Sequence, residues 1–175
     1  MRTPVAIGTL ILGATIAAGG QTLDQRTTGQ LKRLFPDATA FSSREGSPPH
    51  FKAFITDAQS GARSILGYAF WTTELEPLER GYDGPIKILV GVNPKGTLAG
   101  VVVVDHHEPY GYFSVDMPEF ARQFKDKDIR DAFKVGDDVD AVSRATMTVT
   151  SAARAIRNGS RRLATKLLTP PETAR

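Results

Sequence analysis

The sequence predicts a single α+β domain, built as a twisted, mostly antiparallel sheet flanked by helices. Two pairs of strand-like segments are each joined by a short polar turn, a pattern typical of antiparallel hairpins. Segments with helical spacing of apolar residues precede and follow these pairs. The length of 175 residues is enough for one domain with a sizeable core, and too short for two comfortable ones.

The strands are predicted from alternating or continuous apolar residues on either side of turn sequences. The two turns are Asp57 to Gly61 and Asn93 to Gly96. Because the run Val101 to Val104 is apolar throughout, this strand is expected to be covered on both faces. An acidic connection that contains proline is expected at 72–80. The predicted strands are residues 51–56, 65–71, 86–92 and 97–105, after an extended segment at 38–41.

Helices are expected in three regions around the sheet. Spaced leucines predict a first helix over 22–35. One or two short amphipathic helices are expected within 117–133, with a break near 126–128. The final helix is expected to begin near Thr150 and to be weakened at Gly159, because glycine is a poor helix former.

The N-terminal segment has the features of a secretory signal peptide. It carries one positive charge, a short apolar run and then Ala-Ala-Gly-Gly. The run is shorter than the roughly 20 residues that cross a bilayer, so residues 1–20 are expected to be a signal peptide. The protein is therefore expected to be periplasmic, with an uncleaved N-terminal anchor as the alternative. Residues 169–175 are expected to form a disordered tail.

The composition excludes several classes of site. Zero cysteines exclude disulfides, thiolate metal sites and cysteine-ligated iron–sulfur clusters in this chain. Twenty-two basic residues against nineteen acidic residues give a net charge of +3. This mild excess does not indicate a nucleic-acid partner.

Hydroxyl side chains crowd the start of the predicted final helix, from Asp140 to Ser151. The start of a helix presents unpaired backbone N–H groups and the positive end of the helix dipole, which together favour a phosphate-sized anion. The alternative is that these serines and threonines merely cap the helix near Thr150.

Four of these residues resemble the flavinylation motif of the FMN-binding domain family, in which the last threonine is joined to FMN by a phosphoester bond. They are Asp140, Ser143, Ala145 and Thr146, and Arg144 stands where the family usually has glycine. Glycine is the usual choice where the backbone needs a positive φ or a close approach. The resemblance implies covalent FMN on Thr146, attached by a flavinyltransferase that uses FAD.

Three further segments resemble the same family. They are Gly81-Tyr-Asp-Gly-Pro-Ile86, which resembles the start of a strand beside the flavin, the His-Glu-Pro-Tyr-Gly segment 107–111, and Phe35-Pro-Asp-Ala38. The similarity is strongest to the periplasmic FMN domain of NosR-type regulators of nitrous oxide reductase. It extends to the flavinylated subunits of the Rnf and Na⁺-translocating NADH:quinone reductase complexes. Residues 21–168 are therefore identified as a member of the family.

The resemblance implies an electron-transfer protein, without catalytic residues of its own, that works between periplasmic or membrane redox partners. The flavin would do the redox chemistry, and the protein would supply position and electrostatics. Thr148 or nearby backbone N–H groups would hold the phosphate. The implied FMN-binding residues are Tyr82, Gly84, Pro85, Ile86, His107, Glu108, Ser143, Arg144, Ala145, Thr146 and Thr148.

Other interpretations of the same residues stay open. His106, His107 and Glu108 are potential metal ligands, although adjacent residues of an extended segment point to opposite faces. The arginines at 154, 157 and 161 share one helix face, which is a solvated face or a docking patch for an acidic partner or a phosphate. The alternative functions are a regulatory or ligand-binding module of the same fold without flavinylation, and a flavin reductase with its own small substrate.

Overall fold

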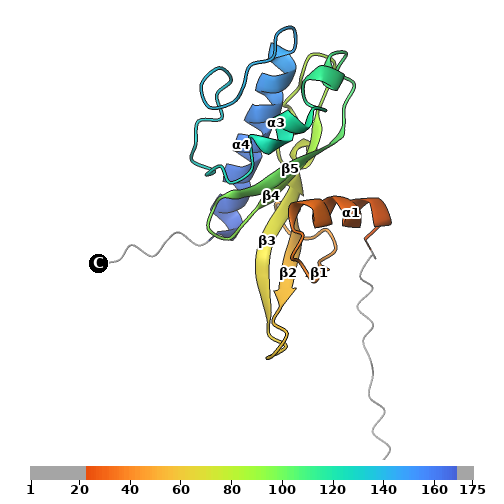
Figure 1. Cartoon of the computed structure of the whole chain (residues 1–175), viewed down its shortest axis with the longest axis vertical. Helices are drawn as coiled ribbons and strands as arrows, with labels where there is room; N and C mark the ends of the chain where they lie inside the picture. Colours follow the sequence, from red (N-terminus) through yellow and green to blue (C-terminus); the bar gives the residue numbers. More distant parts are fainter. Residues whose placement is uncertain (1–22, 169–175) are drawn as a thin grey trace, which may run out of the picture.

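A computed structural model describes residues 23–168, so the expected signal peptide and the expected tail lie outside the described residues. These residues form one five-stranded antiparallel sheet, in which each strand pairs with its neighbours in the sequence. Helices pack on the sheet, which confirms the α+β class (Figure 1). The strands are β1 (Ala40–Phe41), β2 (Phe51–Thr56), β3 (Arg63–Trp71), β4 (Lys87–Val92) and β5 (Leu98–Asp105).

Helix α1 (Gln25–Leu34) covers one face of the sheet. It begins at Asp24, whose carboxylate accepts a hydrogen bond from the backbone N–H of Thr27 at 2.8 Å. Leu31 and Leu34 are buried in a cluster with apolar residues of β4 and β5, among them Leu89. The spacing of these leucines is therefore what fixes the helix on the sheet.

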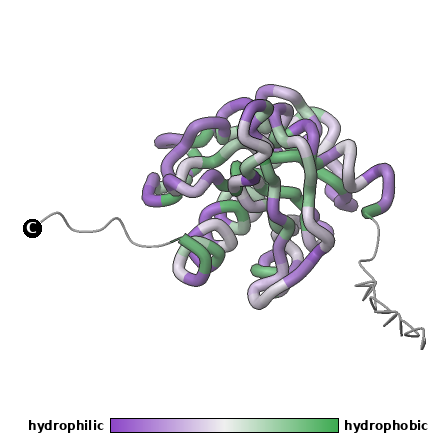
Figure 2. The backbone as a smooth tube through the Cα atoms, turned by 90° about the horizontal axis from the view of Figure 1, so that it is seen from below, coloured by the Kyte–Doolittle hydropathy of each residue, from purple (hydrophilic) through white to green (hydrophobic). Residues whose placement is uncertain are grey.

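The long helix α4 (Thr146–Leu167) covers the opposite face together with the short helix α3 (Pro118–Arg122). Side chains alternate along β4, so that Ile88 and Val90 face α4 while Leu89 faces α1. The valine run of β5 is likewise divided between the two clusters, as the sequence predicted. Apolar segments accordingly lie toward the inside of the fold and polar segments in the outer loops (Figure 2).

Two short elements differ from the prediction. The connection at 72–80 contains a single helical turn, α2 (Thr72–Leu75), that the sequence analysis missed. Within 117–133 only α3 is an α-helix. The residues after it turn away because Asp126 has a φ of 64° and pairs with the start of β5, its N–H donating to the Leu98 carbonyl at 2.9 Å.

The prediction for the last helix was wrong at its start and at its middle. It begins at Thr146 rather than near Thr150, and it runs without a break through Gly159. Gly159 is buried against the ring of Phe70, and a Cβ at this position would overlap that ring. The glycine therefore allows close helix–sheet packing instead of weakening the helix.

No helix among residues 23–168 is both long enough and apolar enough to cross a bilayer.

Candidate functional site: the cleft at the start of α4

Thr146 is the first residue of α4, and its side chain is exposed. The residue before it, Ala145, is the N-cap; it is buried and makes no side-chain capping bond. The interpretation that a serine or threonine caps this helix is therefore wrong. Since the first N–H groups of a helix have no partner within the helix, this helix start is open to an anion.

Arg144 lies in the left-handed region of backbone conformation, with a φ of 67°. The family's usual glycine suggested either a positive φ or a close approach of the backbone at this position, and the structure shows the positive φ. For a residue with a Cβ this conformation costs roughly 1–2 kcal/mol. The bend at Arg144 turns the chain into α4 and leaves Thr146 at the surface.

A cleft of about 310 Å³ opens beside Thr146. Three separate segments form it: the connection between β3 and β4, the loop after β5, and the start of α4. Two tyrosines on its walls have large exposed fractions, 70% for Tyr82 and 43% for Tyr110. Exposed aromatic faces around a concavity are suited to stacking on a planar ring. The residues that line the cleft are Tyr82, Tyr110, Arg144, Thr146, Met147 and Thr148.

Glu108, in the loop after β5, connects the three segments that form the cleft. It is buried, and its carboxylate accepts the backbone N–H of Tyr82 at 3.0 Å and of Asp83 at 2.9 Å. The hydroxyl of Thr148, in the first turn of α4, donates to the same carboxylate. A side chain at Gly81 would overlap this carboxylate, so only glycine fits there. Glu108 thereby fixes the tyrosine loop to the helix that carries Thr146.

Comparison with known proteins points to the same part of the chain. Residues 81–160 match the FMN-binding domain family. The resemblance seen in the sequence is therefore confirmed, and every residue that lines the cleft lies within the matched range.

Curated relatives match a shorter stretch of the chain, 48 residues. Over 48 residues the chain is 46% identical to a protein of Haemophilus influenzae strain PittEE, the subunit named G of an ion-translocating oxidoreductase complex. The identity to the corresponding protein of strain 86-028NP is also 46% over 48 residues. In both cases the match covers 27% of this chain. The chain spans only 21% of the length of these relatives.

The structure divides the implied FMN-binding residues into two groups. Tyr82, Arg144, Thr146 and Thr148 line the cleft, whereas the other residues do not. Ile86 is buried in the core under α4. The residues away from the cleft lining are Gly84, Pro85, Ile86, His107, Glu108, Ser143 and Ala145.

Gly84 and Glu108 act on the cleft without lining it. Gly84 has a φ of 126°, and its carbonyl accepts the N–H of Gly81 at 2.7 Å, which closes the turn that presents Tyr82. Glu108 orders the same turn from below. Thr148 also changes its expected role, because its one hydroxyl proton is donated to Glu108 and is not free for a phosphate. Of the two alternatives for holding the phosphate, the geometry favours the backbone N–H groups.

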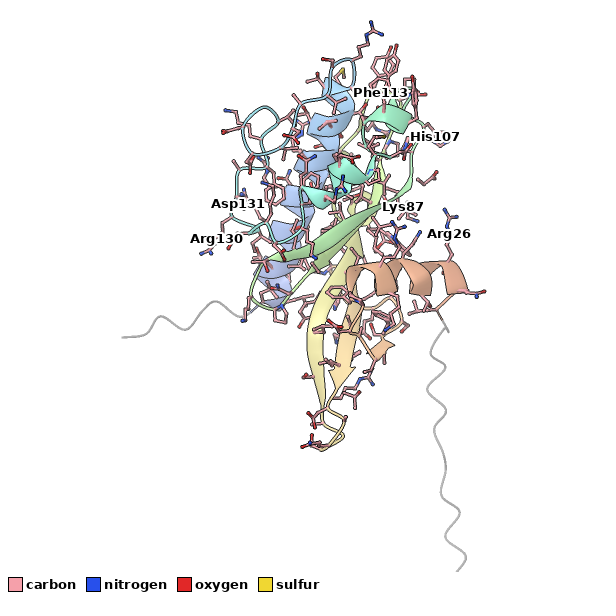
Figure 3. The ribbon with its side chains drawn as sticks, in the orientation of Figure 1. Arg26, Lys87, His107, Phe113, Arg130 and Asp131 are labelled. Atoms are coloured by element: carbon pink, nitrogen blue, oxygen red, sulfur yellow. The ribbon has the colours of Figure 1, made fainter. Side chains whose placement is uncertain are left out.

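The two neighbouring histidines have different surroundings. His106 Nδ1 accepts the backbone N–H of Glu108 at 3.1 Å, which assigns the ring proton to Nε2, 2.9 Å from Asp116 Oδ1. His107 is exposed, and Figure 3 places it at the same end of the molecule as Phe113, in the loop after β5. Within the described part of the chain no group of three or more potential ligands could hold a metal ion.

Two lining residues were not among the predicted FMN-binding residues. They are Tyr110 and Met147. The signal for Tyr110 is its position directly after the His-Glu-Pro sequence. Met147 has an exposed fraction of 62%, and its only sequence signal is that it follows Thr146.

Proposed function

We propose that this protein is an exported flavoprotein that carries FMN in phosphoester linkage to Thr146 and transfers electrons between periplasmic or membrane redox partners. One observation carries the proposal. The Thr146 hydroxyl belongs to an exposed residue at the first position of a long helix, and it lies on a cleft within the region that matches the FMN-binding domain family.

Thr146 is suited to the attachment reaction. Its Oγ would attack the FMN phosphorus of FAD held by a separate flavinyltransferase. A threonine–phosphorus ester bond forms, the bond from phosphorus to the AMP phosphate oxygen breaks, and AMP leaves. The hydroxyl proton passes to a base of the transferase or to solvent. Exposure of Thr146 and the small side chain of Ala145 support access by a second protein.

The ester that forms keeps a negative charge, and the start of α4 is suited to it. The positive end of the helix dipole and the uncapped N–H groups of the first turn would stabilise the charge. Arg144 also lines the cleft, and its guanidinium can donate charge-assisted hydrogen bonds to phosphate. Thr148 contributes indirectly, by holding the buried carboxylate of Glu108.

The cleft fits a planar, amphipathic ring. Its volume of about 310 Å³ lies at the lower end of the roughly 300–1,000 Å³ seen for small-molecule sites. Tyr82 and Tyr110 offer aromatic faces, and Met147 offers a polarisable side chain. Bound FMN would supply one- or two-electron chemistry, while the residues of the cleft orient it and control access of water. The names of the relatives, as subunits of an oxidoreductase complex, support redox partners.

Mass spectrometry of the intact protein tests the attachment. The chain is expressed with a flavinyltransferase and an FAD supply, beside Thr146→Val, which keeps the shape but removes the hydroxyl. The wild type should gain one FMN less one water, and Thr146→Val should gain nothing. Thr150→Val is the matched control and should still be modified, because Thr150 is on the same helix but does not line the cleft. A wild-type chain without the added mass would refute the covalent proposal.

The position of Arg144 supports a second candidate function. A guanidinium on the cleft rim could hold an anionic ligand without a covalent bond, in a regulatory or ligand-binding module of the same fold. Acid precipitation separates the two candidates. Flavin that remains with the precipitated protein supports the ester, and flavin that is released into the supernatant supports the second candidate.

A further inference from the structure

Three of the four arginines of α4, Arg154, Arg157 and Arg161, share a helix face with Thr146. At about 100° per residue, Thr146, Thr150, Arg154, Arg157 and Arg161 fall within an arc of about 80°. The last four of these residues line a groove of about 380 Å³ that is separate from the cleft beside Thr146. The groove lies between α4 and the loop before the flavinylation motif, near Arg130 and Asp131 in Figure 3.

The groove combines an apolar part with a basic part. Phe133 and Val135 contribute apolar surface, and Lys134 contributes a fourth positive charge. No acidic side chain is among the described residues that line it. The Lys134 ammonium has a carboxylate partner in Asp137, but at 3.7 Å and with both side chains largely exposed. Such a pair contributes little, so the ammonium remains available to another anion.

Most of the guanidinium contacts are to neutral oxygens. Arg161 donates to the backbone carbonyls of residues 129, 130 and 131, at 2.8, 3.2 and 2.9 Å. Arg157 donates from Nη1 to the Ala132 carbonyl at 3.2 Å and from Nε to the Asn158 side chain at 3.0 Å. Arg154 alone of the three pairs with a carboxylate, that of Glu79 at 2.7 Å. Carbonyl partners order a guanidinium without cancelling its charge, so Arg157 and Arg161 are neither freely solvated nor neutralised.

We propose that this groove docks an acidic segment of a partner protein. A carboxylate would bind the remaining N–H groups of Arg157 and Arg161, and an apolar side chain next to it would cover Phe133 and Val135. We infer an acidic partner from charge complementarity, since the guanidinium group of arginine matches a carboxylate in geometry as well as in charge. A segment that projects can enter a concave groove, whereas a flat membrane surface meets only its rim.

Fluorescence anisotropy with a labelled glutamate-rich peptide that has a central leucine tests the proposal. The test protein carries Arg157→Gln and Lys134→Gln, which leave the three carbonyl contacts of Arg161 in place. Arg26→Gln is the control for charge, because Arg26 is on α1, across the sheet (Figure 3). A glutamine-rich peptide is the control for the probe.

The double variant should bind the acidic peptide at least about tenfold more weakly than the wild type, since the loss of a single charge-assisted hydrogen bond already has this effect. Arg26→Gln should stay within about twofold, and added salt should weaken wild-type binding. Equal binding by the wild type and the double variant would overturn the proposal. So would binding to phosphatidylglycerol vesicles without binding to the peptide. Thr146→Val should bind the peptide like the wild type, so this result does not depend on the flavin.

Discussion

Glu108 offers the sharpest test of how the cleft is held together. In Glu108→Gln, an amide NH₂ group replaces one of the two carboxylate oxygens that accept the N–H groups of Tyr82 and Asp83. The new amide N–H group then faces one of these backbone N–H groups in a buried position, so one hydrogen bond is lost. The hydrogen bonds that remain are no longer made to a charged acceptor. A hydrogen bond to a charged group contributes about 1.5–3 kcal/mol, so the free energy of unfolding should fall by about 2–3 kcal/mol. Local opening should expose the same two amides.

Urea unfolding followed by the fluorescence of Trp71, and hydrogen exchange of the Tyr82 and Asp83 amides, measure the two effects. Glu119→Gln is the matched control, because its ion pair with Arg122 is exposed and exposed pairs contribute about 1 kcal/mol or less. An unfolding free energy for Glu108→Gln within about 0.5 kcal/mol of the wild type, with both amides still protected, would refute the proposed role of Glu108.

Further predictions concern backbone conformation, packing at glycines and one charged side chain. Arg144→Gly should be more stable to urea than Arg144→Ala by about 1 kcal/mol, because only glycine adopts the positive φ without strain; equal stability would contradict the strain. Gly159→Ala should lower the free energy of unfolding by about 1–2 kcal/mol by overlap with Phe70. Gly29→Ala, with open space around it, should instead raise that free energy by about 0.5–1 kcal/mol. Burial raises the pKa of Asp138, but two backbone N–H groups and a lysine outweigh it and hold the pKa below its usual 3.8. Its stabilisation should therefore be full above that value and be lost as the pH falls through the lowered pKa, so urea unfolding of wild type and Asp138→Asn should converge in acid.

The sheet was predictable because its signals are local. Each hairpin of the sheet contains two apolar runs around a polar turn, and these runs form β2 to β5 within two residues of their predicted bounds. The first helix was also predictable, since its leucines share one face. The hydrophobic pattern of a short segment is sufficient for such elements.

The start of α4 was not predictable from local rules. Hydroxyl residues favour N-cap positions, and this preference suggested a later start, whereas the real N-cap is Ala145. The turn depends on Arg144 in a conformation that few residues adopt. The unbroken course of the helix further along depends on close packing at Gly159. Both depend on contacts or strain that no short window of sequence shows.

The chemistry of the cleft was predicted in part. The motif pointed to Thr146, and the glycine loop pointed to Tyr82; both line the cleft. The role of Glu108 was not predictable, because its hydrogen-bond partners lie 25, 26 and 40 residues away along the chain. Tyr110 reaches the cleft by the same kind of long-range approach.

Fragmentation of one tryptic peptide tests the central claim most directly. Cleavage after Arg144 and Arg154 releases residues 145–154, which contain Thr146, Thr148 and Thr150. In protein produced with a flavinyltransferase, we predict that this peptide carries FMN and that the fragments locate it on Thr146. A peptide without FMN, or with FMN on Thr148 or Thr150, would contradict it.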